Sequence, residues 1–91
     1  MELYYRGESM HPLFRPGDVL DVRPCVPSSV RAGDVIVFVP PGEEKQVVHR
    51  VCSGGPEGFR TKGDNNPQPD PWGIAPDRVI GRVVSVRRAG R

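Results

Sequence analysis

Glycine and proline divide this chain into short apolar runs that are rich in β-branched residues. The sequence has 11 glycines and 11 prolines among its 91 residues. The most apolar run, residues 35–39, is unbroken, as in a strand buried on both faces. No segment repeats apolar residues with the period of an amphipathic helix. These features predict an all-β protein rather than a disordered chain.

The same pattern places the strands and turns. The expected strands cover residues 2–6, 19–23, 35–39, 46–51, 59–61 and 79–86, so six or seven are expected in all. A flexible turn is expected at residues 53–58, and Gly81 is expected to mark a bulge in the last strand. We therefore expect one domain over residues 1–91, either a partly open barrel or a folded antiparallel sheet.

Charge and hydropathy argue against two classes of partner. The net charge is +2, and much of the basic excess lies near the C-terminus in Arg82, Arg87, Arg88 and Arg91. So small an excess does not predict a nucleic-acid partner. No apolar run approaches the roughly 20 residues needed to cross a bilayer, and no export signal is present. A cytoplasmic or membrane-peripheral location is expected.

The two cysteines suggest neither a metal site nor a redox motif. Cys25 and Cys52 have neither the spacing of zinc ligands nor that of a C-x-x-C pair. Each lies near the end of an apolar run, so buried or half-buried thiols are expected. Whether they form a disulfide stays open.

A serine lies in a turn near the start of the chain, within residues 7–12 (GESMHP). Gly7 can adopt backbone angles that other residues avoid, and Pro12 disfavours a helix at the residue before it. Such a turn presents Ser9 to solvent. Alone it is an ordinary surface turn, but with a base and an orienting acid Ser9 becomes a candidate nucleophile.

Two histidines could act as the base for Ser9. His11 shares the turn of the serine and is expected to point elsewhere. His49 lies in an apolar strand that can cross the sheet toward the turn, although a single strand histidine is usually structural. Since neutral imidazole accepts a proton near neutral pH, His49 is the candidate general base.

Residues 62–72 contain three prolines and no strand or helix period, which predicts an irregular loop of the kind that often carries function. The loop carries Asp64 and Asp70. One could orient the imidazole of His49 while the other holds the loop, or both could be ordinary turn and surface residues. A metal site built from His49, Asp64 and Asp70 is a further alternative, but it lacks a recognisable ligand spacing.

Five motifs resemble the conserved boxes of type I signal peptidases and their relatives. They are residues 7–12 (GESMHP) with 15–20 (RPGDVL), 32–38 (AGDVIVF), 48–51 (VHRV), 61–70 (TKGDNNPQPD) and 80–83 (IGRV). The motifs follow the order of the family and cover nearly the whole chain. The histidine of the third motif is similar to the branch found in endoplasmic-reticulum, archaeal and sporulating-bacterial enzymes.

This resemblance implies a serine endopeptidase. Ser9 would be the nucleophile, His49 the general base, and Asp70 the acid that orients the base, with Asp64 supporting the site. The resemblance also implies a folded all-β core of the signal-peptidase and SOS-repressor type, with no metal or cofactor. Its expected partner is a leader-bearing precursor, bound as an extended peptide along a sheet edge, cut after a small residue, with the Ser9 N–H meeting the oxyanion.

The sequence departs from the family pattern in three places. Some relatives have a hydroxyl two residues before the nucleophile, where this chain has Gly7. The membrane anchor of the family normally precedes the first motif, whereas eight residues precede Ser9, and the second subdomain of the bacterial enzymes has no counterpart. These differences favour a small unanchored relative that trims a dedicated precursor.

Two other classes of function remain as alternatives. The self-cleaving domains of SOS repressors share the fold and a similar serine motif, but they use lysine where this chain has His49. A non-catalytic module that binds peptide or nucleic acid could also keep this scaffold.

Overall fold

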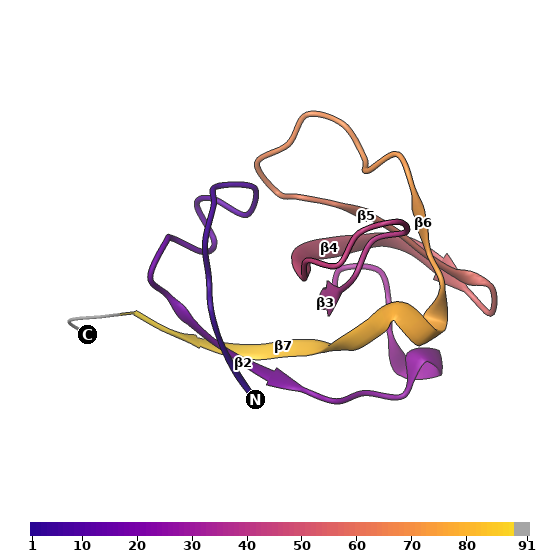
Figure 1. Cartoon of the computed structure of the whole chain (residues 1–91), viewed down its shortest axis with the longest axis horizontal. Coiled ribbons are helices and arrows are strands. Elements are labelled where there is room, and N and C mark those ends of the chain that lie inside the picture. The colour runs from indigo at the N-terminus through magenta and orange to yellow at the C-terminus, as the bar shows by residue number, and fades with distance from the viewer. Residues whose placement is uncertain (89–91) are drawn as a thin grey trace.

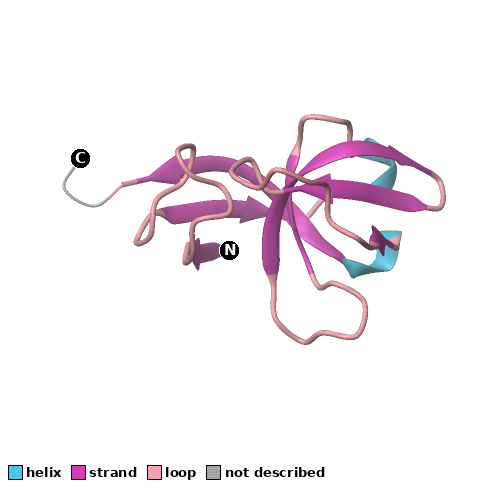
Figure 2. Ribbon diagram, turned by 90° about the horizontal axis from the view of Figure 1, so that it is seen from above, coloured by secondary structure: helices cyan, strands magenta, loops and turns pink. Residues whose placement is uncertain are grey.

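The computed structural model describes residues 1–88, which form a single open antiparallel sheet (Figures 1 and 2). Its strands are β1 (Glu2–Tyr4), β2 (Val19–Arg23), β3 (Val35–Phe38), β4 (Val47–Gly55), β5 (Gly58–Lys62), β6 (Gly73–Ile74) and β7 (Val79–Arg87). The sheet order is β1-β2-β7-β3-β4-β5-β6. Because β1 and β6 do not pair, the sheet is not closed into a barrel. The all-β prediction is confirmed, in its folded-sheet form.

Strand β7 joins the two halves of the sheet, as Figure 1 shows along the lower edge of the molecule. Its C-terminal part pairs with β2 and its N-terminal part with β3. Ile80 has no partner on β3, so the strand bulges next to Gly81, as the sequence predicts. A side chain at Gly81 would place its Cβ 2.6 Å from the carbonyl oxygen of Arg23. Glycine is therefore needed where β7 passes β2.

The core consists of two clusters. One lies around the serine turn and contains Tyr5, Met10, Phe14, Leu20, Val22, Val35, Val37 and Val48. The other contains Val30, Ile36, Phe38, Val51, Phe59 and Ile74. All four residues of β3 are buried, as expected for a strand with both faces covered, and the strand contributes to both clusters. The turn that carries Ser9 is thus anchored on one half of the core.

The hairpin of β4 and β5 is longer than the sequence predicts. Strand β4 continues through Ser53, Gly54 and Gly55, where a flexible turn is expected, and only two residues separate it from β5. A Cβ at Gly54 would lie 2.5 Å from the ring of Phe59, so the absence of a side chain lets the two strands close over that ring. The turn predicted at residues 53–58 is therefore confined to Pro56 and Glu57.

The basic residues near the C-terminus form ion pairs with carboxylates. Arg82 pairs with Asp34, Arg87 with Glu2, and Arg88 with Asp18, while Arg91 lies outside the described residues. Asp18 is 1% exposed, and the hydrogen bond from Arg88 holds the pKa of its carboxyl below the usual value against the opposing effect of burial. Among residues 1–88, no helix has the length and apolar character to cross a membrane.

The cysteines are not joined in the structure. Cys25 is half-buried, as expected, whereas Cys52 is exposed. Cys52 lies beyond the last buried residue of β4, at the point where that strand leaves the core. The expectation of a buried or half-buried thiol is therefore wrong for Cys52.

Candidate active site

The serine turn lies between β1 and β2 and is held in place by the loop that follows β5. Met10 points into the core with no exposed surface, whereas the neighbouring Ser9 is half-buried. The N–H of Asn65 donates a hydrogen bond to the carbonyl oxygen of Ser9 at 2.7 Å, and its side-chain amide donates to Glu8 at 3.0 Å. Both hydrogen bonds are accepted by backbone carbonyl oxygens of the turn, so neither of them uses the hydroxyl of Ser9.

Three side chains that are distant in the sequence meet beside this turn. His49 projects from β4, and its Nε2 lies 3.1 Å from Oγ of Ser9. Asp70 comes from the loop after β5, and its Oδ2 lies 2.6 Å from Nδ1 of the same imidazole. His49 is 6% exposed and Asp70 is 7% exposed. The structure therefore brings Ser9, His49 and Asp70 together in one hydrogen-bonded row.

The chemistry of each group fixes the direction of these hydrogen bonds. An ionised carboxylate only accepts, so Nδ1 of His49 must carry a hydrogen to donate to Asp70. A neutral imidazole with its hydrogen on Nδ1 has a lone pair on Nε2, and that lone pair faces the hydroxyl of Ser9. The row can accordingly take a proton from serine and hold the resulting imidazolium beside a carboxylate.

A buried threonine holds Asp70. Thr61, on β5, has no exposed surface, and its hydroxyl donates to Oδ2 of Asp70 at 2.7 Å. The N–H of Asp70 in turn donates to the carbonyl oxygen of Thr61 at 2.8 Å. Sequence analysis gives no role to Thr61, since a threonine in a strand is ordinary, and only the fold shows which carboxylate lies beside it.

Asp64 forms an ion pair with Arg50, and no hydrogen bond joins it to His49 within residues 1–88. Both its oxygens accept hydrogen bonds from the guanidinium of Arg50 at 2.9 Å, and Arg50 also donates to the carbonyl oxygen of Gly33. These contacts join the loop to β4 and to the turn before β3. The hydrogen bond from Arg50 holds the pKa of Asp64 below its usual value, against the opposing effect of burial. His11 is exposed.

The Asp64–Arg50 pair gives a pH-dependent contribution to stability. Replacing Asp64 with asparagine is expected to lower the free energy of unfolding by about 1 kcal/mol at neutral pH. The bidentate geometry strengthens the ion pair, whereas its partial exposure to solvent weakens it. A lowered folded-state pKa stabilises the protein above the unfolded-state value, and this stabilisation disappears as the pH falls through the folded-state value. Urea unfolding of both proteins at neutral pH and at about pH 3 should show the difference shrinking in acid. A difference that grows in acid would contradict this assignment.

Gly63 allows the loop to approach the serine turn closely. A Cβ there would lie 2.8 Å from the carbonyl oxygen of Ser9, 3.0 Å from its Cβ and 2.7 Å from the amide nitrogen of Asn66. We expect Gly63→Ala to displace Ser9 from His49. In a reaction that uses this pair, kcat should fall roughly tenfold to a hundredfold, as misplacement of about 1 Å can cause. Gly55→Ala is the matched control, since its Cβ would meet nothing within 4 Å. Equal activity of the two variants would contradict close packing at Gly63.

One edge of β4 is unpaired next to the row of side chains. Strand β5 pairs with residues 50–55 of β4, from the Arg50–Lys62 pair to the hairpin. Residues 47–49 pair with β3 on one side only, and on the other side no strand of the described residues covers them. This edge leads directly to His49, so the backbone of an extended peptide could pair with it next to Ser9.

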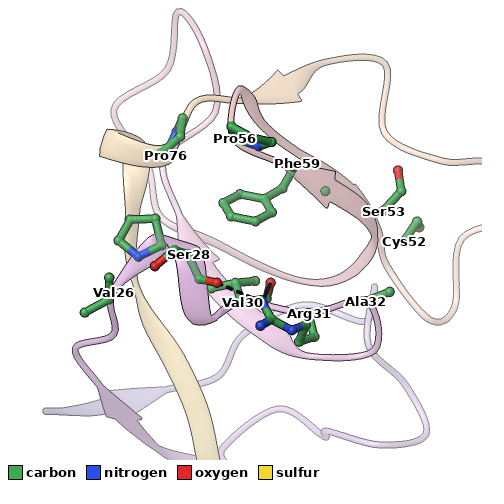
Figure 3. Close-up of a pocket in the computed structure, with 13 residues that line it drawn as sticks. Val26, Ser28, Val30, Arg31, Ala32, Cys52, Ser53, Pro56, Phe59 and Pro76 are labelled. Carbon is green, nitrogen blue, oxygen red and sulfur yellow. Dashed lines mark hydrogen bonds between the residues drawn. The ribbon is translucent and has the colours of Figure 1, made fainter.

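A pocket of about 840 Å³ lies away from the row, between the β4–β5 hairpin and the segment after β2 (Figure 3). The ring of Phe59 points into it, with Val30 and Pro56 among its walls and Cys52 and Ser53 at one side. None of the three side chains of the row lines this pocket. For the metal alternative, the described residues contain no group of three or more His, Cys, Asp or Glu side chains placed to hold an ion.

Comparison with known proteins gives a partial match to one kind of enzyme. The chain is 40% identical over 63 residues to the signal peptidase complex catalytic subunit SEC11C of Homo sapiens, and equally to those of Mus musculus and Canis lupus familiaris. The match covers 64% of this chain and 33% of each relative, so the chain spans about a third of their length. No family model and no solved structure matches. The chain is thus a partial homologue of a signal peptidase catalytic subunit, which supports the family resemblance of its motifs.

Proposed function

We propose that this chain is the catalytic core of a serine endopeptidase that removes a leader or signal peptide from a precursor protein. The observation that supports this most is the row in which Ser9 lies 3.1 Å from His49, and His49 lies 2.6 Å from Asp70. The partial similarity to a signal peptidase catalytic subunit supports the same class of substrate.

The proposed reaction has two steps. Ser9 Oγ attacks the peptide carbonyl carbon while its proton passes to Nε2 of His49, and the carbonyl electron pair moves to oxygen. As the intermediate collapses, the C–N bond breaks and the proton moves from His49 to the departing amine, leaving an ester on Ser9. His49 then takes a proton from water, whose oxygen attacks the ester carbon, and the proton returns to Ser9 Oγ as the acid leaves. Asp70 stays ionised throughout and stabilises the imidazolium.

The backbone N–H of Ser9 is a candidate donor to the oxyanion. It makes no hydrogen bond within residues 1–88, so it is free to meet the negative charge that develops on the carbonyl oxygen. A fixed backbone donor at that position stabilises the intermediate without having to reorient during the reaction.

The substrate is an extended peptide in this proposal. Its backbone would pair with the free edge at residues 47–49, where β5 no longer covers β4. The loop at Gly63 and the serine turn touch, which brings Ser9 beside that edge. Strand addition recognises backbone, so it would position a scissile bond without demanding a long sequence motif.

The test is cleavage of a synthetic library of extended peptides, in which mass spectrometry identifies each new terminus. We expect cuts after small residues, and we expect each cut to be lost when the backbone nitrogens beside the cut are methylated, because methylation removes donors needed for strand pairing. A library left intact by the purified chain, or cuts indifferent to methylation, would contradict the proposed endopeptidase or its binding edge.

A further inference from the structure

The hydroxyl of Tyr5 lies beside Ser9, although the side chain belongs to the core. Tyr5 is 4% exposed, and its ring contacts that of Phe14 edge to face, with 5.6 Å between centroids. Its N–H donates to the carbonyl oxygen of Asp18 at 2.8 Å, and its own carbonyl oxygen accepts from the N–H of Gly17 at 3.0 Å. Packing and main-chain bonds together fix where this phenol points.

The other hydrogen bond of the phenol leaves its hydroxyl hydrogen available to donate to Ser9. The N–H of Met10 donates to the Tyr5 oxygen at 2.9 Å, so that contact uses a lone pair and not the phenolic proton. The other contact of this oxygen is with Ser9 Oγ at 3.4 Å. Ser9 has a single hydroxyl proton, which faces the lone pair of His49. Tyr5 must therefore be the donor to Ser9. The hydroxyl of Tyr5 donates a hydrogen bond to Ser9, and the hydroxyl of Ser9 donates one to His49.

The geometry points to Tyr5 as a further catalytic residue, whose hydroxyl donates a hydrogen bond to Ser9 Oγ while that oxygen carries negative charge. This inference rests on the proposed serine peptidase function. Oγ gains charge as its proton leaves for His49, and again when the ester is hydrolysed and the C–Oγ bond breaks, with the electron pair remaining on Oγ. Tyr5 keeps its own proton at each step, so the proton balance of the reaction is unchanged.

The length of the contact agrees with such a role. At 3.4 Å it is longer than a strong hydroxyl–hydroxyl bond, whose usual length is about 2.7 Å. Contacts of catalytic groups are often long without substrate and shorten as charge develops. The bond to Met10, at 2.9 Å, holds the phenol in place until then.

The test compares Tyr5→Phe with Tyr4→Phe, on a peptide that the library experiment shows to be cut. Tyr4 is the adjacent residue, undergoes the same chemical change and is 68% exposed, so it is a matched control. We expect Tyr5→Phe to lower kcat roughly tenfold to a hundredfold with KM changed less than about threefold, as for the loss of one donor at a reaction centre. Tyr4→Phe should leave both constants within about twofold. Each rate is divided by the folded fraction of that variant, which thermal unfolding measures.

A second replacement separates donation to Ser9 from support of Met10. Replacing Tyr5 with 4-aminophenylalanine keeps an N–H donor of nearly the same size, but its nitrogen is a poor acceptor for the N–H of Met10. We expect kcat to return to within about fivefold of the unmodified protein. If Tyr5→Phe keeps kcat within about threefold, or the amino replacement stays as slow as Tyr5→Phe, the inference is overturned.

Ser9→Ala distinguishes the failure of this inference from failure of the proposed function. Should Ser9→Ala still cleave the peptide, the serine mechanism fails, and the role of Tyr5 fails with it. Should Ser9→Ala be inactive while Tyr5→Phe keeps the full rate, only the role of Tyr5 is wrong.

Discussion

Ser9→Ala is expected to reduce peptide cleavage by roughly 10⁴-fold or more while leaving the protein folded. Removing the nucleophile of a serine–histidine pair removes covalent catalysis, so only electrostatic and binding effects remain. The fold should tolerate the change, because the contacts that hold this residue use its backbone oxygen and the packing of Gly63 against it. The loss should appear in kcat, with peptide binding retained, as steady-state kinetics and a binding titration of the inactive protein would show.

Controls make this result specific. Ser53→Ala removes an exposed hydroxyl at the far end of β4 and should leave cleavage unchanged. His49→Ala should be about as slow as Ser9→Ala, and the double variant no slower than either, because two groups that act in one step lose their effect together. Cleavage by Ser9→Ala at a hundredth of the normal rate or faster would exclude Ser9 as the nucleophile.

The sequence identifies the three polar residues but not their surroundings. Short β-branched runs between turn residues predict an all-β chain because strand pairing needs little more than extended, half-buried segments. The irregular loop after β5 is equally readable from its three prolines. Motif order then selects Ser9, His49 and Asp70 from many candidates. None of this fixes a distance in space, since His49 is 21 positions from Asp70 in the sequence and 40 positions from Ser9.

What the sequence misses depends on side-chain contacts that local propensity does not encode. Tyr5 and Thr61 read as ordinary strand residues, because aromatic and β-branched side chains favour strands anywhere. Their hydroxyls acquire meaning only where the fold brings Tyr5 to Ser9 and Thr61 to Asp70. The pattern Gly54-Gly55 misleads for a related reason, since glycine marks turns locally but here lets β4 lie against Phe59. Close approach between strands is not encoded in local propensity.

A small core can hold this site because the loop is attached at several points. Asn65 binds the serine turn, Asp64 binds Arg50, and the N–H of Asp64 contacts the sulfur of Met10 at 3.3 Å. Each attachment is weak alone, but together they fix both ends of the row of side chains. Asp70 therefore need not be rigid through its own segment, since Thr61 and His49 hold it from β5 and β4.

Asp70→Asn is expected to lower kcat by roughly 10³- to 10⁴-fold, because the amide no longer favours the imidazole tautomer that serine requires. Thr61 and His49 contact the same oxygen of Asp70, so an asparagine would present either its oxygen or its NH₂ to both of them. The amide oxygen would keep the hydrogen on Nδ1, but it would bring no negative charge to stabilise the imidazolium. An NH₂ group must meet a lone pair on Nδ1, which moves the ring hydrogen to Nε2. Nε2 would then donate to Ser9 instead of accepting its proton.

The control for Asp70→Asn is Thr61→Val. This change removes the hydroxyl that donates to the carboxylate of Asp70 but keeps the shape of the side chain at position 61. With the carboxylate intact, His49 keeps its hydrogen on Nδ1, so this variant should lose far less activity than Asp70→Asn. The difference separates choice of tautomer from simple positioning, and nitrogen NMR of His49 can read the tautomer directly in each protein. If Asp70→Asn retains more than about a tenth of kcat, or its imidazole keeps the hydrogen on Nδ1, the carboxylate does not act through the tautomer. Oδ2 of Asp70 accepts from both Thr61 and His49, and its negative charge strengthens both hydrogen bonds in a way that a neutral asparagine oxygen does not.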